Sequence, residues 1–129
     1  MSVLLFGTEM GMVKQVEGNE FDVAKRTIAA TKLQDEDRLI SVVCMGEAET
    51  AVFKTVQGMC LRIPIGEIPQ KKKGAIGVRG IRLNEGDKVE QMYYPDSQKD
   101  KILIYKDKEV HLDRLKIGKR DTKGTKIRV

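Results

Sequence analysis

An internal repeat with a period of about 47 residues is the feature of this 129-residue chain that most limits its fold. Residues 4–21 align with residues 51–68, and residues 31–43 align with residues 81–93 at an offset of 50, so the second copy carries a three-residue insertion. The first alignment pairs Phe6 with Phe53, Thr8 with Thr55, Gly11 with Gly58, Met12 with Met59 and Phe21 with Ile68. A third copy begins at residue 101. The repeat predicts one domain built from about two and a half similar units, approximately residues 2–47, 48–97 and 98–129.

Each unit has the residue pattern of short antiparallel strands. Runs of four to eight residues rich in Val, Ile and Thr are separated by polar turns such as residues 34–37 and 84–87. Residues 27–33 and 76–83 are predicted as strands on the same grounds. No window of a dozen residues has the apolar spacing of an amphipathic helix. We therefore predict an all-β chain with about four strands per unit, the content of a propeller-like blade.

Composition excludes several classes of protein. No apolar run approaches the roughly 18 residues that span a bilayer, so an integral membrane protein is not expected. The first ten residues lack the basic start and the small-residue cleavage site of a secretory signal. Cys44 and Cys60 are too few for a disulfide framework. These features predict a cytoplasmic protein.

The charge is distributed unevenly along the chain, and this distribution is more informative about function than the net charge of +5. The net charge is −3 over residues 1–48, +2 over residues 49–98 and +6 over residues 99–129. Residues 70–82 carry five basic side chains and no acidic one, and residues 114–129 carry seven basic side chains and one acidic one. Both stretches contain glycines and β-branched residues, so neither is predicted to be a disordered tail. A polyanionic partner is the functional interpretation, and an ordinary solvated surface is the alternative.

Phosphate contacts need surface cations, accessible backbone amides and few acidic neighbours, and both basic stretches have this composition. Glycines in each stretch would let the backbone approach a phosphate closely. The candidate DNA-binding residues are Lys71, Lys72, Lys73, Arg79, Arg82, Lys116, Lys119, Arg120, Lys123 and Lys126. No helix is predicted that would enter a major groove, so we expect contacts that tolerate any sequence and bend the DNA.

Catalytic and metal-binding interpretations have little support. His111 lies within a predicted strand without a nucleophile nearby, and the two cysteines occur singly, unlike zinc ligands. The acidic runs 35–37 and 85–87 recur at the same turn of each unit, which favours a role in the turn over a metal site. Residues 74–80 lack the Lys-Ser/Thr that completes a nucleotide-binding P-loop. No catalytic residue, metal ligand or cofactor is therefore predicted in this chain.

Aromatic side chains are predicted to pack in the interior. Phe6, Phe53 and Tyr105 take early-strand positions, where a core role is favoured over stacking on single-stranded nucleic acid. Tyr93 and Tyr94 point to opposite faces of a strand, so one of them is a candidate for exposure.

The motif GAIGVRGIRLNEGDKVEQM, residues 74–92, resembles the repeat of the C-terminal domain of bacterial DNA gyrase and topoisomerase IV A subunits. In that family, a strand of the form G-x-R-G-I-x-L precedes an acidic turn and the last strand of the unit. The matching positions here are Gly77, Arg79, Gly80, Ile81 and Leu83. Residues 11–42 and 119–129 resemble other parts of the same repeat, so the resemblance extends over essentially the whole chain.

The resemblance implies a β-pinwheel, a propeller-like disc of four-stranded blades that exchange strands and carry a basic outer rim for DNA. This chain would be a fragment or a reduced form of that disc. Its partners would be duplex DNA and the A-subunit core and B subunit of the intact enzyme. The catalytic tyrosine, the ATPase site and the use of Mg²⁺ would belong to those other parts. Exposed strand edges also make self-association of such a partial disc a hypothesis.

One departure from the family bears on the type of enzyme. The gyrase box reads Gln-Arg-Arg-Gly-Gly-basic-Gly, whereas residues 70–77 read QKKKGAIG and lack the double glycine and the fourth basic residue. We therefore favour a topoisomerase IV-like subunit over gyrase. The alternative function is a protein-docking module that contacts the topoisomerase core or a chromosome-organising partner.

Overall fold

The computed structural model describes residues 3–18, 33–44, 46, 48–72 and 74–128. Their secondary structure consists of short strands with three 3₁₀ turns, and the predicted all-β fold is confirmed. The described part of the chain contains no helix of the length and apolarity that crossing a bilayer requires.

The first sheet has the strand order β3-β1-β2-β6. Its strands are β1 (Val3–Thr8), β2 (Met12–Glu17), β3 (Leu39–Cys44) and β6 (Val78–Arg79). Strands β1 and β2 form a hairpin, and β3 pairs with β1 in antiparallel register. The fourth strand, β6, comes from the second sequence repeat and pairs with β2 through Met12 opposite Arg79. A strand of one repeat therefore completes the sheet of the repeat before it.

The second sheet repeats this arrangement in the order β10-β5-β4-β7. Its strands are β4 (Thr50–Thr55), β5 (Met59–Pro64), β7 (Val89–Tyr93) and β10 (Thr125–Lys126). Strand β10 comes from the third repeat and pairs with β5. It lies 47 residues after β6, so the strand exchange recurs with the period of the sequence.

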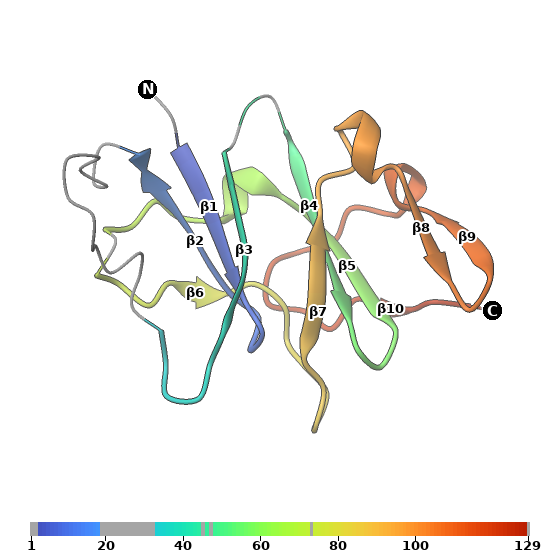
Figure 1. Ribbon diagram of the computed structural model, residues 1–129, viewed down its shortest axis with the longest axis horizontal. Coiled ribbons are helices and arrows are strands. Elements are labelled where there is room, and N and C mark those ends of the chain that lie inside the picture. The colour runs from blue at the N-terminus through green and yellow to red at the C-terminus, as the bar shows by residue number, and fades with distance from the viewer. Residues whose placement is uncertain (1–2, 19–32, 45, 47, 73, 129) are drawn as a thin grey trace.

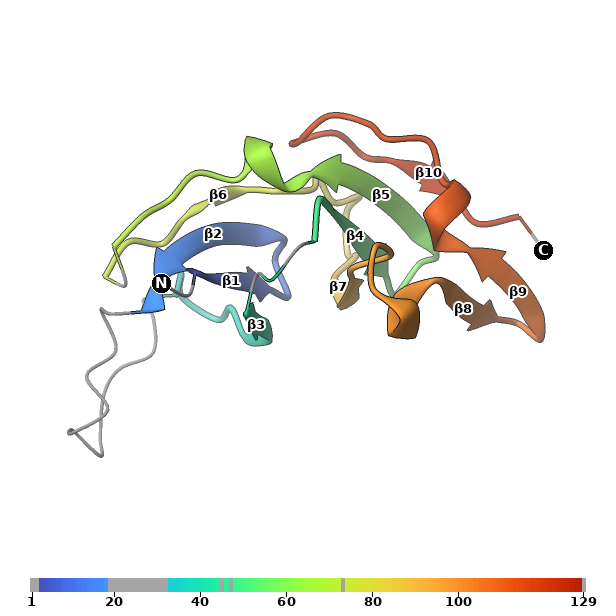
Figure 2. The same cartoon turned by 90° about the horizontal axis from the view of Figure 1, so that it is seen from above.

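The third repeat contributes a hairpin of β8 (Ile102–Tyr105) and β9 (Lys108–His111). Three 3₁₀ turns complete the described structure: η2 (Ile65–Glu67), η3 (Gln98–Asp100) and η4 (Leu112–Arg114). The sheets stand side by side along the molecule (Figure 1). Seen from above they form an open arc, with β3, β7 and β8 towards its concave side and β5 towards its convex side (Figure 2).

The β1–β2 and β4–β5 turns show why the repeat residues recur. Gly11 and Gly58 have φ angles of +85° and +91°, a conformation that favours glycine. In each turn, a threonine hydroxyl accepts a hydrogen bond from the amide four residues later, at 3.1 Å from Thr8 Oγ1 to Met12 N and 3.0 Å from Thr55 Oγ1 to Met59 N.

The last aspartate of each acidic run bonds to the hairpin turn from the separate turn that precedes β3 or β7. Asp37 Oδ1 accepts hydrogen bonds from the amides of Met10 and Arg38, at 2.9 and 2.8 Å. In the second sheet, Asp87 Oδ1 binds the amides of Gln57 and Lys88, at 3.0 and 2.8 Å. These contacts confirm that the recurring aspartates serve the turns.

The core lies between neighbouring sheets. One apolar cluster joins Leu5 and Val13 of the first sheet to Ala51 and Phe53 of the second. A second cluster joins Val52 and Cys60 to Leu112 and the flanking residues of the third repeat. Each sheet therefore depends on its neighbour to bury one face.

Most of the aromatic side chains that were predicted to pack in the interior are buried or half-buried. Phe6, Phe53 and Tyr94 are buried, while Tyr93 and Tyr105 are half-buried. Lys54 Nζ lies 5.0 Å from the centre of the Tyr105 ring and forms an ion pair with Glu90.

The predicted strand over residues 76–83 is wrong in its extent, because only Val78 and Arg79 form strand β6. The chain then leaves β2 and crosses to the second sheet, where Ile81 is buried. Gly80 marks the crossing point: a Cβ there would lie 2.9 Å from Val13 Cγ2 and 3.0 Å from Phe53 Cε1. The other predicted strand, residues 27–33, falls almost entirely outside the described residues.

We expect Gly80→Ala to lower the free energy of unfolding by about 2 kcal/mol, because the added methyl group overpacks the core at Phe53 and Val13. Urea denaturation would measure the loss. Gly66→Ala is the matched control, since a Cβ at Gly66 meets no atom within 4 Å. Equal stability of the two variants would contradict the close packing at Gly80.

Candidate nucleic-acid interface

The two basic stretches form equivalent loops in successive sheets. The first basic loop (69–77, of which the structure describes residues 69–72 and 74–77) runs beside β2, and the second basic loop (residues 116–124) runs beside β5. Gln15 forms a parallel bridge with Gln70, and Arg62 forms one with Ile117. The next amide in each loop donates a 2.7 Å hydrogen bond to the strand, from Lys71 N to Gln15 O and from Gly118 N to Arg62 O. Each residue in the second set of contacts lies 47 residues after its counterpart in the first set, so the loops are copies of one structural element.

Glycine lets each basic loop rejoin its sheet. Gly77 and Gly124 have φ angles of +101° and +75°. A Cβ at Gly77 would lie 2.6 Å from Val13 O, and a Cβ at Gly124 would clash with Cys60 O. The chain therefore passes directly against the preceding hairpin, and the exchanged strands β6 and β10 begin at the next residue.

Side chains from the hairpins hold the start of each loop. Their role was not predicted from the sequence. Gln15 Nε2 donates to the carbonyl oxygens of Ile65 and Ile68, at 3.2 and 2.7 Å. At the equivalent position, Arg62 Nη1 donates to the carbonyl oxygens of Asp113 and Leu115, each at 3.1 Å. The only sequence signal was that both residues are polar at the same place in the repeat.

The Asp96 carboxylate contacts both Arg62 and the start of β4. Its Oδ2 accepts 2.8 Å hydrogen bonds from the amides of Glu49 and Thr50, and its Oδ1 lies 3.8 Å from Arg62 Nη2. Desolvation alone would raise the pKa of Asp96, but these hydrogen bonds and the Arg62 charge lower it overall. Arg62 thus ties the second basic loop to β4 and to the turn after β9.

Lys14 supports the first basic loop from inside the protein. Only 2% of this residue is exposed, and its Nζ donates to the carbonyl oxygens of Lys72 and Ala75, at 3.3 and 2.5 Å. Its ammonium group also lies 5.6 Å from the centre of the Phe6 ring. The buried position of Lys14 could have been predicted from the sequence, because the repeat aligns Lys14 with the apolar Leu61.

The second basic loop contacts the first basic stretch directly. Arg82 N donates to Thr122 O at 2.9 Å, and Asp121 N donates to Gly80 O at 2.8 Å. Arg120 Nη1 reaches Arg79 O at 2.9 Å. Three arginines that are up to 41 residues apart in the chain are thereby gathered in one place.

Asp121 lies at the centre of these arginines. Its Oδ1 is 2.5 Å from Arg79 Nε and 3.7 Å from Arg82 Nε, and Arg79 Nη2 donates to its Oδ2 at 3.2 Å. The hydrogen bond from Arg79, together with the positive charges of Arg79, Arg82 and Arg120, holds the pKa of Asp121 below its usual value. Asp121 is therefore an anion at neutral pH, and it orders Arg79 while cancelling part of the local positive charge.

Most of the predicted DNA-binding residues reach solvent. Exposed members of the set are Lys71, Lys72, Arg79, Arg82, Lys116, Lys119, Lys123 and Lys126. Arg120 is half-buried, and Lys126 Nζ bonds to Gln57 O. Lys73 lies outside the described residues. Both basic loops follow the convex side of the arc (Figure 2).

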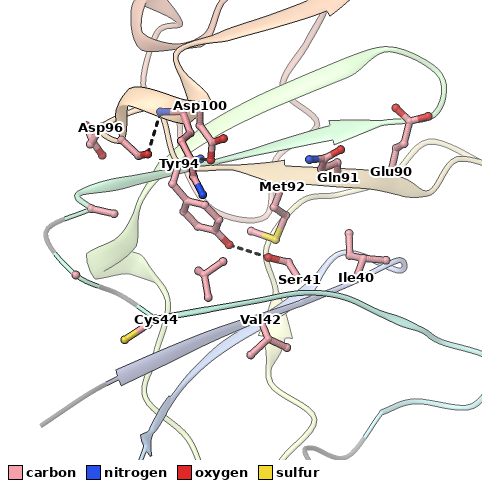
Figure 3. A pocket seen from close by; sticks show the side chains of 15 residues that line it. Ile40, Ser41, Val42, Cys44, Glu90, Gln91, Met92, Tyr94, Asp96 and Asp100 are labelled. Atoms are coloured by element: carbon pink, nitrogen blue, oxygen red, sulfur yellow. Dashed lines mark hydrogen bonds between the residues drawn. The ribbon is translucent and has the colours of Figure 1, made fainter.

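A groove of about 810 Å³ lies between the edge strands β3 and β7, away from the basic loops. Figure 3 shows Tyr94 reaching across it to Ser41, with 3.1 Å between the two hydroxyl oxygens. Burial raises the pKa of Tyr94 to about 12, although the hydrogen bond to Ser41 opposes the shift. Glu90, Asp96 and Asp100 also line the groove. These carboxylates make it a poor site for phosphate.

The residues considered for catalysis are not assembled into a site in the described structure. Burial raises the pKa of the Cys60 thiol to about 11, which leaves it protonated at neutral pH, and Cys44 lies in another sheet. His111 lies in β9, with its Nε2 3.6 Å from Glu109 Oε2. Among the described residues, no three His, Cys, Asp or Glu side chains are grouped as metal ligands would be.

Comparison with known sequences identifies the family. The sequence model for the DNA gyrase C-terminal domain, described as a beta-propeller, matches residues 2–44 and 52–93, which is more than half of the chain. The chain belongs to the DNA gyrase C-terminal domain family. The predicted resemblance to a partial β-pinwheel is thus confirmed, and the strand exchange seen here is the arrangement that it implied.

Several A subunits of DNA gyrase are relatives of this gyrase C-terminal domain protein. It is 34% identical to the subunit of Lawsonia intracellularis over 86 residues, which cover 66% of this chain and 10% of the relative. It is 31% identical to the subunit of Buchnera aphidicola over 128 residues, which cover 95% of this chain and 15% of the relative. The chain spans 10–15% of the length of the relatives it matches.

Solved structures of gyrase-type C-terminal domains share its fold. The C-terminal domain of a DNA topoisomerase IV superposes with a TM-score of 0.86 at 24% identity, over 98% of this chain and 41% of that domain. The Escherichia coli ParC C-terminal domain gives a TM-score of 0.75 at 21% identity, over 98% of this chain and 56% of that domain. The present chain thus has the fold of about half of such a domain.

We expect Asp121→Asn to reduce stability at neutral pH, because the variant loses the ionic contacts to Arg79 and Arg82. The folded state depresses the pKa of Asp121, so its contribution is present above the pKa of the unfolded chain, about 3.9, and is lost as the pH falls through the lower folded value. Urea denaturation of both proteins from pH 7 to pH 3 would measure the difference. A difference that stays constant over this range would contradict the ionic role.

Proposed function

We propose that this chain is a non-catalytic module that binds and bends duplex DNA as part of a type IIA topoisomerase A subunit. The observation that supports the proposal most strongly is the meeting of the two basic stretches around Arg79, Arg82 and Arg120. Family membership supports the same function. In this proposal the chain works in the cytoplasm, at the nucleoid, and the predicted repeat units 2–47, 48–97 and 98–129 correspond to its successive blades.

The proposed mechanism is electrostatic. Cations of the two basic loops would neutralise phosphates along a DNA segment and hold it against the curved edge of the sheets. Backbone contacts anchor both loops to β2 and β5, so the cations project from a rigid support. The chain would supply no catalytic group or cofactor. DNA cleavage, ATP hydrolysis and Mg²⁺ binding would belong to the A-subunit core and the B subunit.

We expect charge reversal at Lys71 and Lys72, and separately at Lys119 and Lys123, to weaken binding to duplex DNA at least about tenfold at low salt. Removal of two phosphate contacts should also reduce the slope of log K against log salt by about 1.8. Fluorescence anisotropy of a labelled duplex, measured between about 50 and 200 mM salt, would give both quantities.

The matched control reverses the charge of two exposed lysines away from the basic loops, Lys88 before β7 and Lys99 in η3. This variant should retain most of the affinity. Binding that is independent of salt, or equally weakened by both kinds of variant, would overturn the DNA-binding proposal. It would favour the alternative, a module that docks on the topoisomerase core or a chromosome-organising protein.

We further propose that the parent enzyme is closer to topoisomerase IV than to gyrase. The support is the sequence of residues 70–77, which lacks the double glycine of the gyrase box. We therefore expect the chain to bind plasmid DNA without wrapping it in a chiral sense. After relaxation by a type I topoisomerase, plasmid bound to the chain should have the same mean linking number as plasmid relaxed without it. A consistent shift in linking number would contradict this assignment.

A further inference from the structure

Lys14 is a buried cation with hydrogen bonds to the first basic loop. It lies in β2 opposite Phe6 of β1, and only 2% of the residue is exposed. Its ammonium group donates to the carbonyl oxygens of Lys72 and Ala75, which are 58 and 61 residues away in the chain. An ammonium group is costly to bury without hydrogen bonds, so the burial of Lys14 and the position of these two carbonyl groups depend on each other.

The equivalent carbonyl groups of the second basic loop are bonded differently. They belong to Lys119 and Thr122, each 47 residues after its counterpart. Thr122 Oγ1 donates to Lys119 O at 2.8 Å, and the amide of Arg82 donates to Thr122 O at 2.9 Å. The residue equivalent to Lys14 is Leu61, which lines a cavity of about 340 Å³ between β5 and this loop. The two loops are therefore held by different contacts, although their backbones are copies of one element.

Contact with Lys14 also sets the direction in which parts of the first basic loop face. The carbonyl groups of Lys72 and Ala75 turn towards the interior, whereas the side chains of Lys71 and Lys72 are exposed. A carbonyl oxygen carries partial negative charge, so its removal from the outer surface favours the approach of a phosphate. The loop thus presents its cations to solvent and directs two of its acceptors to Lys14.

We propose that Lys14 is a positioning residue for DNA binding: its buried ammonium group fixes the first basic loop in the conformation that presents Lys71 and Lys72 to the phosphates. This inference rests on the proposed function. Lys14 itself has too little exposed surface to contact DNA, so it acts through the loop. The second basic loop, which has Leu61 at the equivalent position, does not depend on it.

Hydrogen exchange measured by mass spectrometry tests the positioning without DNA. Lys14→Met keeps the length of the side chain but lacks its charge. In this variant the amides of residues 70–77 should exchange at least about tenfold faster, whereas those of residues 116–124 should be unchanged. Lys54→Met is the matched control, because Lys54 is 5% exposed and its ammonium group pairs with Glu90 instead of a basic loop. It should leave exchange at residues 70–77 unchanged.

Unchanged exchange at residues 70–77 in Lys14→Met would overturn the inference. Faster exchange throughout both sheets would also overturn it, because Lys14 would then stabilise the whole fold and not the loop. Lys14→Leu gives a second measurement of the same kind, with the side chain that the repeat carries at position 61.

A double-mutant cycle on duplex affinity tests the consequence for DNA. Lys14→Met should weaken binding at least about threefold, and charge reversal at Lys71 and Lys72 should then have a smaller effect than in the wild-type chain. Charge reversal at Lys119 and Lys123 should have the same effect in both backgrounds. Additive effects at both loops would indicate a general loss of charge and would overturn the role of Lys14 in DNA binding. If the wild-type chain binds no DNA while the first basic loop exchanges faster in Lys14→Met, the positioning of the loop holds and only the proposed function fails.

Discussion

The strand exchange between repeats depends on close passage of the backbone at Gly77 and Gly124. At both positions a side chain would collide with a carbonyl oxygen of the preceding hairpin. Without this approach, β6 and β10 would not reach β2 and β5, and neither four-stranded sheet would be complete. The exchange also ties each repeat to the one before it, so the stability of one sheet depends on its neighbour.

The position of the basic loops follows from the same constraint. Each loop is the connection that brings the chain back to an earlier hairpin, and both loops run along the convex side of the arc (Figure 2). Gln15 and Arg62 hold the start of these connections, and Lys14 holds the middle of the first one. The exposed cations therefore project from backbone that is anchored at several points, which would reduce the ordering cost of the proposed binding to DNA.

Much of this architecture could be predicted from the sequence. The 47-residue alignment identified the equivalent turns, and the structure shows why Thr8 and Gly11 recur as Thr55 and Gly58. The single predicted strand over residues 76–83 was wrong because strand propensity does not register a crossing between sheets at Gly80. Lys14 was missed because a lysine is usually exposed, and only its carbonyl partners from a distant loop permit its burial.

The sequence alone determined the all-β class, the repeat and the two basic stretches, because periodicity, turn residues and charge are local properties. Only the tertiary structure decided that Arg79, Arg82 and Arg120 surround Asp121, and that Lys14 and Arg82 bond to equivalent carbonyl groups of the two basic loops. These outcomes depend on which segments lie against each loop. Such contacts join residues far apart in the chain, and no local pattern specifies them.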